Sequence, residues 1–130
     1  VGVVAVGYAD GFRRALSNQG SMLVRGTRVP VVGAICMDMC MVDLTDLPAA
    51  DVGDEAILVG VDGMERTTLE DVAALCDTIP HEMSTGIGDR PARVYLREGQ
   101  PVAVQTKLDQ RPIPTTASTP RAAVVAAGGR

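Results

Sequence analysis

The sequence predicts a mostly β domain, a small barrel or sandwich with one or two short helices and a flexible C-terminal tail. Short aliphatic runs alternate with turn segments rich in Gly, Asp and Pro, which is typical of small all-β folds. The chain of 130 residues is long enough for one domain with a hydrophobic core. From residue 109 onward Pro, Thr, Ala and Gly dominate and no apolar period persists. We therefore divide the chain into a domain at 1–108 and a flexible tail at 109–130.

The first part of the chain is expected to supply three strands and one loop. Residues 1–6 form a continuous apolar run, which predicts a buried strand. Residues 7–20 are rich in turn formers and charge, and predict a loop. The runs at 22–24 and 29–32 flank an Arg-Gly-Thr-Arg turn and predict a hairpin. Pro30 favours an edge position or a bulge for the second strand of that hairpin.

Alternating apolar residues over 36–44 predict the next strand, and an apolar run at 55–59 predicts another. In a regular strand each residue rises about 3.3 Å, so Cys36 and Cys40 would share a face roughly 13 Å apart. At that separation they could share neither a metal nor a disulfide. Packing as small hydrophobes is therefore the favoured interpretation of both thiols. The three methionines of this segment would line the opposite face, where a core position is expected.

One helix is predicted over 68–77, where apolar residues recur at helical spacing. Thr67 and Glu70 match a capping box, in which the threonine caps the helix and the glutamate reaches back to it. Pro80 prevents direct continuation of this helix. Two short apolar runs within 94–104 flank a Glu-Gly-Gln turn and predict a final hairpin.

Charge and cysteine content exclude several classes of partner. The net charge is −4, and residues 109–130 hold one aspartate and three arginines, which leaves −6 on residues 1–108. An acidic body is not expected to bind nucleic acid or an anionic membrane surface. No apolar run reaches the length of about 18 residues that a membrane span requires. Three cysteines are too few for a disulfide scaffold, so we expect reduced thiols and a cytoplasmic protein.

The Gly-Tyr-Ala-Asp-Gly segment at 7–11 is the first candidate for chemistry. It follows the first predicted strand, so Tyr8 would stand at the mouth of that strand. A phenol in this position can hydrogen-bond a ligand while its ring packs against the protein. The competing interpretation is a plain turn, in which Asp10 and Gly11 reverse the chain.

The Ile-Cys-Met-Asp segment at 35–38 is the second candidate. A strand that starts irregularly after Gly33 would leave the Met37 backbone N–H unpaired and free to bind a carboxylate. Asp38 is either a solvated charge or an orienting partner. His81 is the only histidine, and a lone histidine is more often structural than functional. The sequence contains no glycine-rich phosphate loop, zinc-ligand spacing or Ser/His/Asp arrangement.

These segments occur in the order and approximate spacing of the C-terminal β-domain of alanine racemases, which the chain resembles from residue 1 to about residue 98. The resemblance implies an enzyme with an N-terminal (β/α)8 barrel that carries pyridoxal 5'-phosphate on a lysine. It implies a homodimer in which the β-domain of one subunit lies over the barrel mouth of the other. It also implies interconversion of L- and D-alanine, the source of D-alanine for peptidoglycan precursors. The landmarks of the resemblance are 7–11, 30–33 with 35–38, 52–55, 69–78 and 93–95.

The resemblance implies a role for five residues of this chain. Met37 matches the residue whose backbone amide contacts the substrate carboxylate, and Asp38 matches its acidic neighbour. Tyr8 matches a tyrosine that lines the approach to the active site, and Arg14 matches an arginine of the substrate corridor. His81 aligns where the family usually has a tyrosine that hydrogen-bonds the cofactor phosphate, and an imidazole can still donate to that group.

Neither catalytic base is expected in this chain. The resemblance places the catalytic tyrosine in a Ser-Tyr-Gly segment that would precede Val1, and the catalytic lysine in the barrel. The chain alone is therefore expected to be inactive and to need the barrel for cofactor binding. Ala34 stands where the family usually has an arginine, which removes a charge from the corridor. A broader amino-acid racemase, a related decarboxylase and a non-catalytic dimerisation module remain alternatives.

Overall fold

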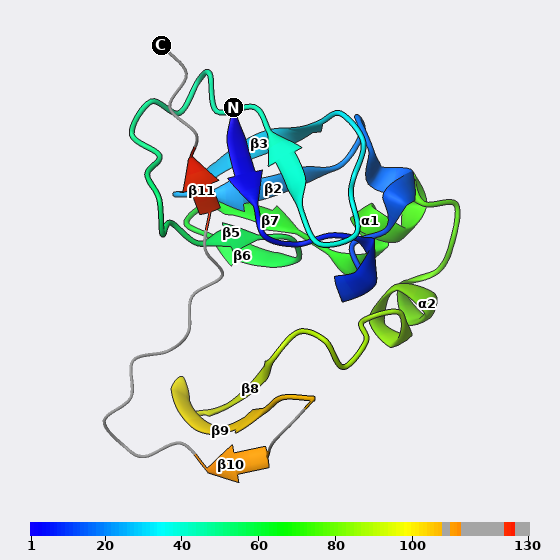
Figure 1. Ribbon diagram of the computed structural model, residues 1–130, viewed down its shortest axis with the longest axis vertical. Coiled ribbons are helices and arrows are strands. Elements are labelled where there is room, and N and C mark those ends of the chain that lie inside the picture. The colour runs from blue at the N-terminus through cyan, green and yellow to red at the C-terminus, as the bar shows by residue number, and fades with distance from the viewer. Residues whose placement is uncertain (108–109, 113–123, 127–130) are drawn as a thin grey trace.

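The computed structural model describes residues 1–107, 110–112 and 124–126. They form a mostly β fold with a curled sheet and two short α-helices (Figure 1), which confirms the predicted fold class. The strands of the largest sheet are β1 (Gly2–Val4), β2 (Ser21–Val24), β3 (Thr27–Val32), β4 (Cys40–Val42), β5 (Ala56–Ile57) and β11 (Val124–Ala126). Within the described residues they run in the order β11-β1-β4-β3-β2-β5, and every pairing is antiparallel.

Two smaller antiparallel units accompany this sheet. β6 (Gly60–Asp62) pairs with β7 (Glu65–Thr67). β8 (Arg93–Arg97), β9 (Gln100–Gln105) and β10 (Gln110–Pro112) form a three-stranded sheet at the lower end of Figure 1, with β9 in the middle. The tail expected at 109–130 lies mostly outside the described residues. Its described parts are β10 and β11, and β11 pairs with β1.

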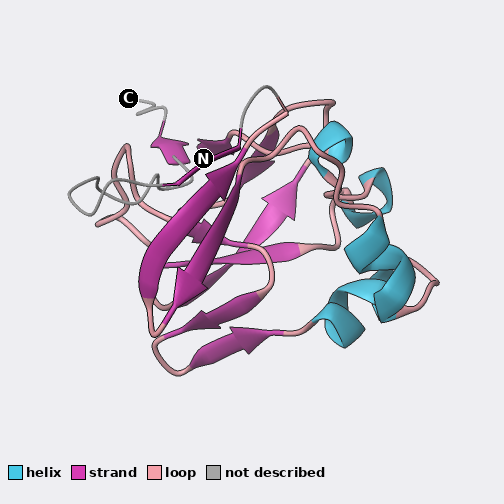
Figure 2. Ribbon diagram, turned by 90° about the horizontal axis from the view of Figure 1, so that it is seen from below, coloured by secondary structure: helices cyan, strands magenta, loops and turns pink. Residues whose placement is uncertain are grey.

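The helices lie together on one side of the strands (Figure 2). They are α1 (Leu69–Leu75) and α2 (Pro80–Thr85). The loop predicted at 7–20 contains two short 3-10 turns, at Tyr8–Asp10 and Arg14–Leu16. Pro80 is the first residue of α2, where its missing N–H has no helical partner to lose. Neither helix of the described chain is long and apolar enough to cross a membrane.

The predicted cap of α1 is wrong by one residue. Thr68 caps the helix: its hydroxyl accepts from the Asp71 N–H at 3.1 Å, and the Asp71 carboxylate accepts from the Thr68 N–H at 2.9 Å. Thr67 is instead the buried last residue of β7, and its hydroxyl accepts from Arg28 at 3.0 Å. Because the sheet uses the Thr67 hydroxyl, the capping box moves one residue along the chain, away from Glu70.

The hairpin of β2 and β3 is confirmed, but Pro30 does not lie on an edge strand. Arg25 and Gly26 form its two-residue turn with φ of +51° and +73°, the left-handed pair that suits a tight hairpin. β3 lies between β2 and β4. Its pairing with β4 covers only Val31 and Val32, so the missing N–H of Pro30 falls outside the paired stretch.

The strand predicted over 36–44 is wrong in its first half, because β4 begins only at Cys40. Gly33 turns the chain with φ of +76°, and the Cys36 N–H then donates to the Met39 carbonyl at 2.9 Å. Residues 36–39 therefore form a turn. The carbonyls of Cys36 and Met37 accept hydrogen bonds from residues 8 and 9 instead of from a neighbouring strand.

The side chains of this segment correct two further expectations. Its methionines do not enter the core; the exposed fractions of Met37, Met39 and Met41 are 53%, 46% and 43%. Of the two thiols, Cys40 is buried as a small hydrophobe whereas Cys36 is exposed. The expected face-to-face alternation fails because only 40–42 belong to a strand.

The core lies between the large sheet and the helices, and it is almost wholly aliphatic. Arg28 of β3 attaches the β6–β7 hairpin to the large sheet. Its guanidinium donates to the Thr67 hydroxyl at 3.0 Å and to the Arg66 carbonyl at 2.6 Å. The buried hydrophobic residues are Val4, Phe12, Leu16, Met22, Leu23, Val24, Val29, Val31, Ile35, Cys40, Val42, Ala56, Val72, Ala73 and Met83. Most of these side chains are aliphatic, and Phe12 is the aromatic member among the described residues.

We predict that Leu16→Ala lowers the free energy of unfolding by about 2–5 kcal/mol, because it leaves a cavity in a close-packed core. Leu16 is 1% exposed and lies between the sheet and α1. Leu96→Ala is the matched control, since Leu96 is 61% exposed, and it should change stability by less than about 0.5 kcal/mol. Urea unfolding of both variants measures the difference, and equal effects would contradict this description of the core.

Candidate functional site

Two backbone segments lie directly against each other: the 3-10 turn at 7–11, called the Tyr8 turn, and residues 35–39, called the Met37 loop. The Tyr8 N–H donates to the Cys36 carbonyl at 3.0 Å, and the Ala9 N–H donates to the Met37 carbonyl at 2.9 Å. A Cβ atom on Gly7 would lie 2.3 Å from the Cys36 carbonyl oxygen and 2.4 Å from the Met37 carbonyl carbon. Only glycine permits this approach, so residue 7 fixes how the two segments meet.

The Met37 loop presents an unused donor at the surface. Among the described residues, none accepts a hydrogen bond from the Met37 N–H. The neighbouring Asp38 is half-buried, and the Met37 side chain is 53% exposed. A backbone N–H without an internal acceptor, in an exposed residue of a loop held by its neighbours, is a ready site for a carboxylate or another anion.

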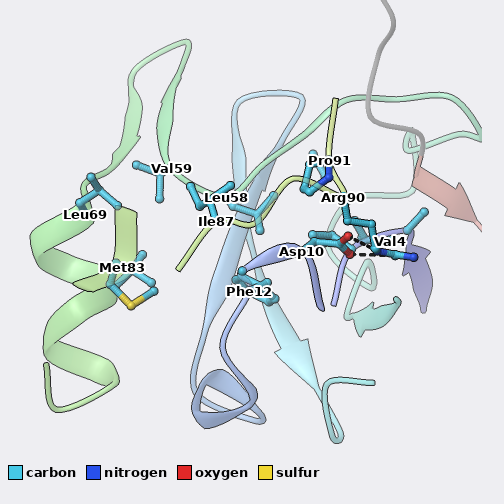
Figure 3. A pocket seen from close by; sticks show the side chains of 15 residues that line it. Val4, Asp10, Phe12, Leu58, Val59, Leu69, Met83, Ile87, Arg90 and Pro91 are labelled. Carbon is cyan, nitrogen blue, oxygen red and sulfur yellow. Dashed lines mark hydrogen bonds and ion pairs between the residues drawn. The ribbon is translucent and has the colours of Figure 1, made fainter. Parts of the chain in front are cut away.

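Asp10 and Arg90 form a two-bond ion pair beside the Tyr8 turn (Figure 3). Arg90 Nε and Nη2 donate to the two Asp10 carboxylate oxygens at 2.6 and 3.1 Å. The Gly7 N–H donates to the same carboxylate at 2.9 Å. The Asp10 side chain is 8% exposed, so the pair is shielded from water on the aspartate side.

These contacts determine the ionisation of the pair. Burial of Asp10 opposes its charge, but the hydrogen bonds from Arg90 and Gly7 and the charge of Arg90 outweigh it and lower the pKa of Asp10. The hydrogen bond to Asp10 raises the pKa of Arg90 against its own desolvation, and the charges of Asp10 and Asp38 raise it further. Arg90 is therefore electrostatically coupled to both acids.

A cavity of about 590 Å³ opens beside the ion pair (Figure 3). Asp10 and Arg90 stand at one end of it, and Leu69 and Met83 from the two helices lie at the other. The remaining lining is almost entirely apolar: Val4, Ala5, Val6, Gly11, Phe12, Ala56, Leu58, Val59, Val72, Ile87 and Pro91. The residues of the Met37 loop do not line this cavity. Asp10 and Arg90 do line it, and Asp10 belongs to the Tyr8 turn that bonds to the loop.

Two hydrogen bonds through Ser17 connect the backbone of Arg14 to the Met37 loop. The Arg14 carbonyl accepts from the Ser17 hydroxyl at 2.6 Å, and the Ser17 oxygen accepts from the Ile35 N–H at 3.0 Å. The Arg14 side chain is exposed, and its guanidinium has no partner among the residues that the structure describes. It is free to meet a ligand from solvent.

His81 lies apart from these contacts, on the exposed face of α2. Its carbonyl accepts from the Ser84 and Thr85 hydroxyls, and its ring has no partner in the described part of the chain. Arg13 joins α2 to the segment after the Tyr8 turn through the Glu82 carbonyl at 3.2 Å. The structure thus brings Tyr8, Met37 and Asp38 together, whereas no hydrogen bond or ion pair joins His81 to them in the described part of the chain.

The thiols do not form a metal or redox site within the described residues. Burial, together with the nearby Cys36, raises the pKa of the Cys40 thiol to about 11. That thiol therefore stays protonated at neutral pH and is a poor nucleophile or ligand. No group of three or more His, Cys, Asp or Glu side chains able to hold a metal occurs in residues 1–107, 110–112 and 124–126.

Sequence reasoning did not identify the Asp10–Arg90 pair. The sequence offers Asp10 only as part of a turn, and no local pattern singles out Arg90. The partners are 80 residues apart, and no local pattern connects them. The only available signal was the Gly-rich stretch after α2, which lets the chain return to the Tyr8 turn.

Comparison with known proteins identifies the family. Residues 1–95 match the family model described as "Alanine racemase, C-terminal domain". The chain belongs to this family. This alanine racemase domain is 49% identical over 98 residues to an alanine racemase of Thermodesulfovibrio yellowstonii. The aligned stretch covers 75% of this chain and 27% of that protein.

Solved structures give the same result. The alanine racemase from Bacillus anthracis with bound L-Ala-P matches with a TM-score of 0.72 and 38% identity, over 82% of this chain and 27% of that one. The alanine racemase from Bartonella henselae with covalently bound pyridoxal phosphate matches with a TM-score of 0.66 and 41% identity. That match covers 72% of this chain and 25% of the Bartonella chain. The chain thus spans about a quarter of the length of these alanine racemases.

In this alanine racemase domain, Asp10→Asn should lower the free energy of unfolding by about 1–2 kcal/mol at pH 7, because charge-assisted hydrogen bonds become neutral. The pKa of Asp10 is lowered by folding, so its ionised form stabilises the fold fully above its ordinary pKa of 3.8. That contribution disappears as the pH falls through the lower pKa of the folded state.

Urea unfolding of the wild type and of Asp10→Asn at pH 7, 5 and 3 measures this dependence. The gap between them should be similar at pH 7 and 5 and smaller at pH 3. Asp46→Asn is the control, because Asp46 is exposed and has no partner among the described residues. If the difference in free energy of unfolding between the wild type and Asp10→Asn stayed constant to pH 3, the stabilising role of the ionised Asp10 carboxylate would be refuted.

Proposed function

We propose that this domain completes the active site of a pyridoxal-phosphate-dependent alanine racemase. The full-length protein interconverts L- and D-alanine in the cytoplasm, as a homodimer in which the β-domain of one subunit lies over the cofactor-bearing barrel of the other. The observation that carries the proposal is the Met37 N–H. In a chain of this family it has no acceptor among the described residues, it belongs to an exposed residue, and Asp38 follows it in the chain.

The Met37 N–H binds the carboxylate of the substrate in this proposal. The loop that carries it is held by two backbone hydrogen bonds from the Tyr8 turn and by the close contact at Gly7. A donor fixed in this way needs little rearrangement when the ligand arrives, which is the condition for strong electrostatic binding. Asp38 orients the substrate from the neighbouring position.

Tyr8 and Arg14 line the approach to this donor. Tyr8 is 49% exposed, and its hydroxyl is free to hydrogen-bond a passing ligand. The exposed guanidinium of Arg14 attracts the carboxylate of an amino acid. Ala34 is exposed nearby and contributes no charge, so the approach carries less positive charge than an arginine there would give.

Pyridoxal phosphate supplies the electron sink for racemisation when it is bound. The residue of this chain that fits it is His81, because an exposed imidazole without a described partner can donate a hydrogen bond to a phosphate. The two catalytic bases belong to parts of the protein outside this chain. The domain alone therefore binds and orients substrate groups but moves no proton between the two faces of alanine.

Met37→Pro and Met37→Ala in the full-length protein test the role of the backbone donor. Proline removes the N–H, so the KM for alanine should rise by about tenfold or more, in keeping with about 1.5–3 kcal/mol for a hydrogen bond to a charged group. The Met37→Ala variant keeps the backbone N–H and loses only a half-exposed side chain. Its KM for the substrate alanine should therefore stay within about threefold of the wild-type value. Racemisation is followed with and without added pyridoxal phosphate.

The same assay tests the function as a whole. The 130-residue chain alone should convert no alanine, while the full-length protein should convert it only with the cofactor. A full-length protein that binds the cofactor but leaves alanine unchanged would contradict the proposal and favour another amino acid or a decarboxylase. Equal KM values for the two Met37 variants would overturn the role of the backbone N–H.

His81→Ala in the full-length protein should weaken pyridoxal-phosphate binding by about tenfold, because a hydrogen bond to the charged phosphate is lost. Titration of the apoprotein with the cofactor, followed by its absorbance, measures this without an activity assay. His81→Tyr should restore the affinity, since a phenol can donate to the same group. Unchanged affinity in His81→Ala would exclude a contact between His81 and the phosphate.

A further inference from the structure

We infer that Arg90 is a positioning residue, which acts through Asp10 to hold the Met37 loop in its ligand-binding position. Arg90 reaches the Tyr8 turn from the segment 86–91, called the return segment, which follows α2. The inference concerns loop geometry, and its link to substrate binding rests on the function proposed above. It assigns a role to a pair of residues that touch neither the Met37 N–H nor any expected ligand.

Asp10 is the first link in this arrangement. Its carboxylate receives two hydrogen bonds from Arg90 and one from the Gly7 N–H, so its side chain has a single favourable orientation. The aspartate side of the pair is 8% exposed, and a buried carboxylate that loses its partner is costly. Removal of the Arg90 guanidinium therefore forces the Asp10 carboxylate to move or to bind water. Because the Gly7 N–H donates to that carboxylate, the Gly7 backbone is displaced with it.

Gly7 is the second link. Its backbone lies against the Met37 loop so closely that a Cβ atom would come within 2.5 Å of the Asp38 nitrogen. Tyr8 and Ala9 follow immediately and donate to the two loop carbonyls. A shift of Gly7 by a few tenths of an ångström is therefore transmitted to the Cys36–Met37 peptide group, which carries the Met37 N–H, and to the Met37–Asp38 peptide group that follows it.

The return segment is fixed firmly enough to act as the anchor. Arg93 Nη2 donates to the carbonyls of Ile87 and Gly88 at 3.1 and 2.9 Å. Gly11, which has φ of +104°, packs so tightly that a Cβ there would lie 2.9 Å from the Ile87 Cα. The guanidinium of Arg90 thus starts from a braced backbone, and lysine could not reproduce its two-bond geometry.

Arg90 also acts on the other end of the loop. Its charge attracts Asp38, the residue after Met37, as well as Asp10. One guanidinium therefore biases the loop in two ways, by hydrogen bonds through Asp10 and by longer-range attraction to Asp38.

The first test compares Arg90→Lys with Arg97→Lys in the full-length protein. Arg97 is an exposed residue of β8 whose side chain has no partner in the described chain, so it is the matched control. Arg90→Lys should raise the KM for alanine about tenfold with kcat within about threefold, because a misplaced donor weakens ground state and transition state alike. Arg97→Lys should change neither.

The second test uses hydrogen exchange of the 130-residue chain and needs no enzymatic activity. In Arg90→Lys the amides of Tyr8 and Ala9, which donate to the Met37 loop, should exchange about tenfold faster than in wild type. The Leu23 amide in the buried strand β2 should be unaffected, and so should all three amides in Arg97→Lys.

The two tests separate the possible failures. Faster exchange at Tyr8 and Ala9 supports the positioning role even if the full-length protein proves not to act on alanine, an outcome that would reject only the proposed function. Exchange that rises equally at Leu23, or does not change at Tyr8 and Ala9, overturns the inference. An unchanged KM in an active Arg90→Lys racemase overturns it as well.

Discussion

The contact between the backbone of residue 7 and the backbone of residues 36–38 is the constraint on which the site depends. It requires glycine at one position, and it directs two N–H groups of the Tyr8 turn onto two carbonyls of the Met37 loop. Since those carbonyls are occupied, the loop cannot join the sheet. The unpaired Met37 N–H and the exposed side chains of Met37 and Met39 follow from that exclusion. A single absent side chain therefore explains both the shape of the loop and its available donor.

The elements that sequence analysis predicted well are those whose partners are neighbours along the chain. The hairpin of β2 and β3 is specified by a turn of two left-handed residues, and the hairpin of β8 and β9 has a similar Glu-Gly turn. Helix α1 is defined by its own apolar spacing. Its cap was wrong by one residue because Arg28, 39 positions away, uses the hydroxyl of Thr67. Local pattern fixed the element, and a tertiary contact moved its boundary.

The features that could not be predicted join segments far apart in the sequence. Alternation over 36–44 satisfied the pattern of a strand, yet its first half bonds to residues 8 and 9 and leaves the sheet. The exposure of Met37 and Met39 follows from this, whereas Met41 lies in β4 and points to the outer face of the sheet. The Asp10–Arg90 pair has the same origin. The resemblance to alanine racemases drew attention to Met37 and Asp38, but only the structure revealed what holds them in place.

The separation of 80 residues between Asp10 and Arg90 has a consequence for the order of folding. A hairpin closes a short loop within microseconds, whereas the entropic cost of joining two chain positions grows with the length between them. The sheet can therefore assemble from its own hairpins before the return segment docks. We expect the Met37 loop to be the last part of the domain to reach its final position. By the same reasoning, the earliest opening of the native state releases the loop and keeps the sheet intact.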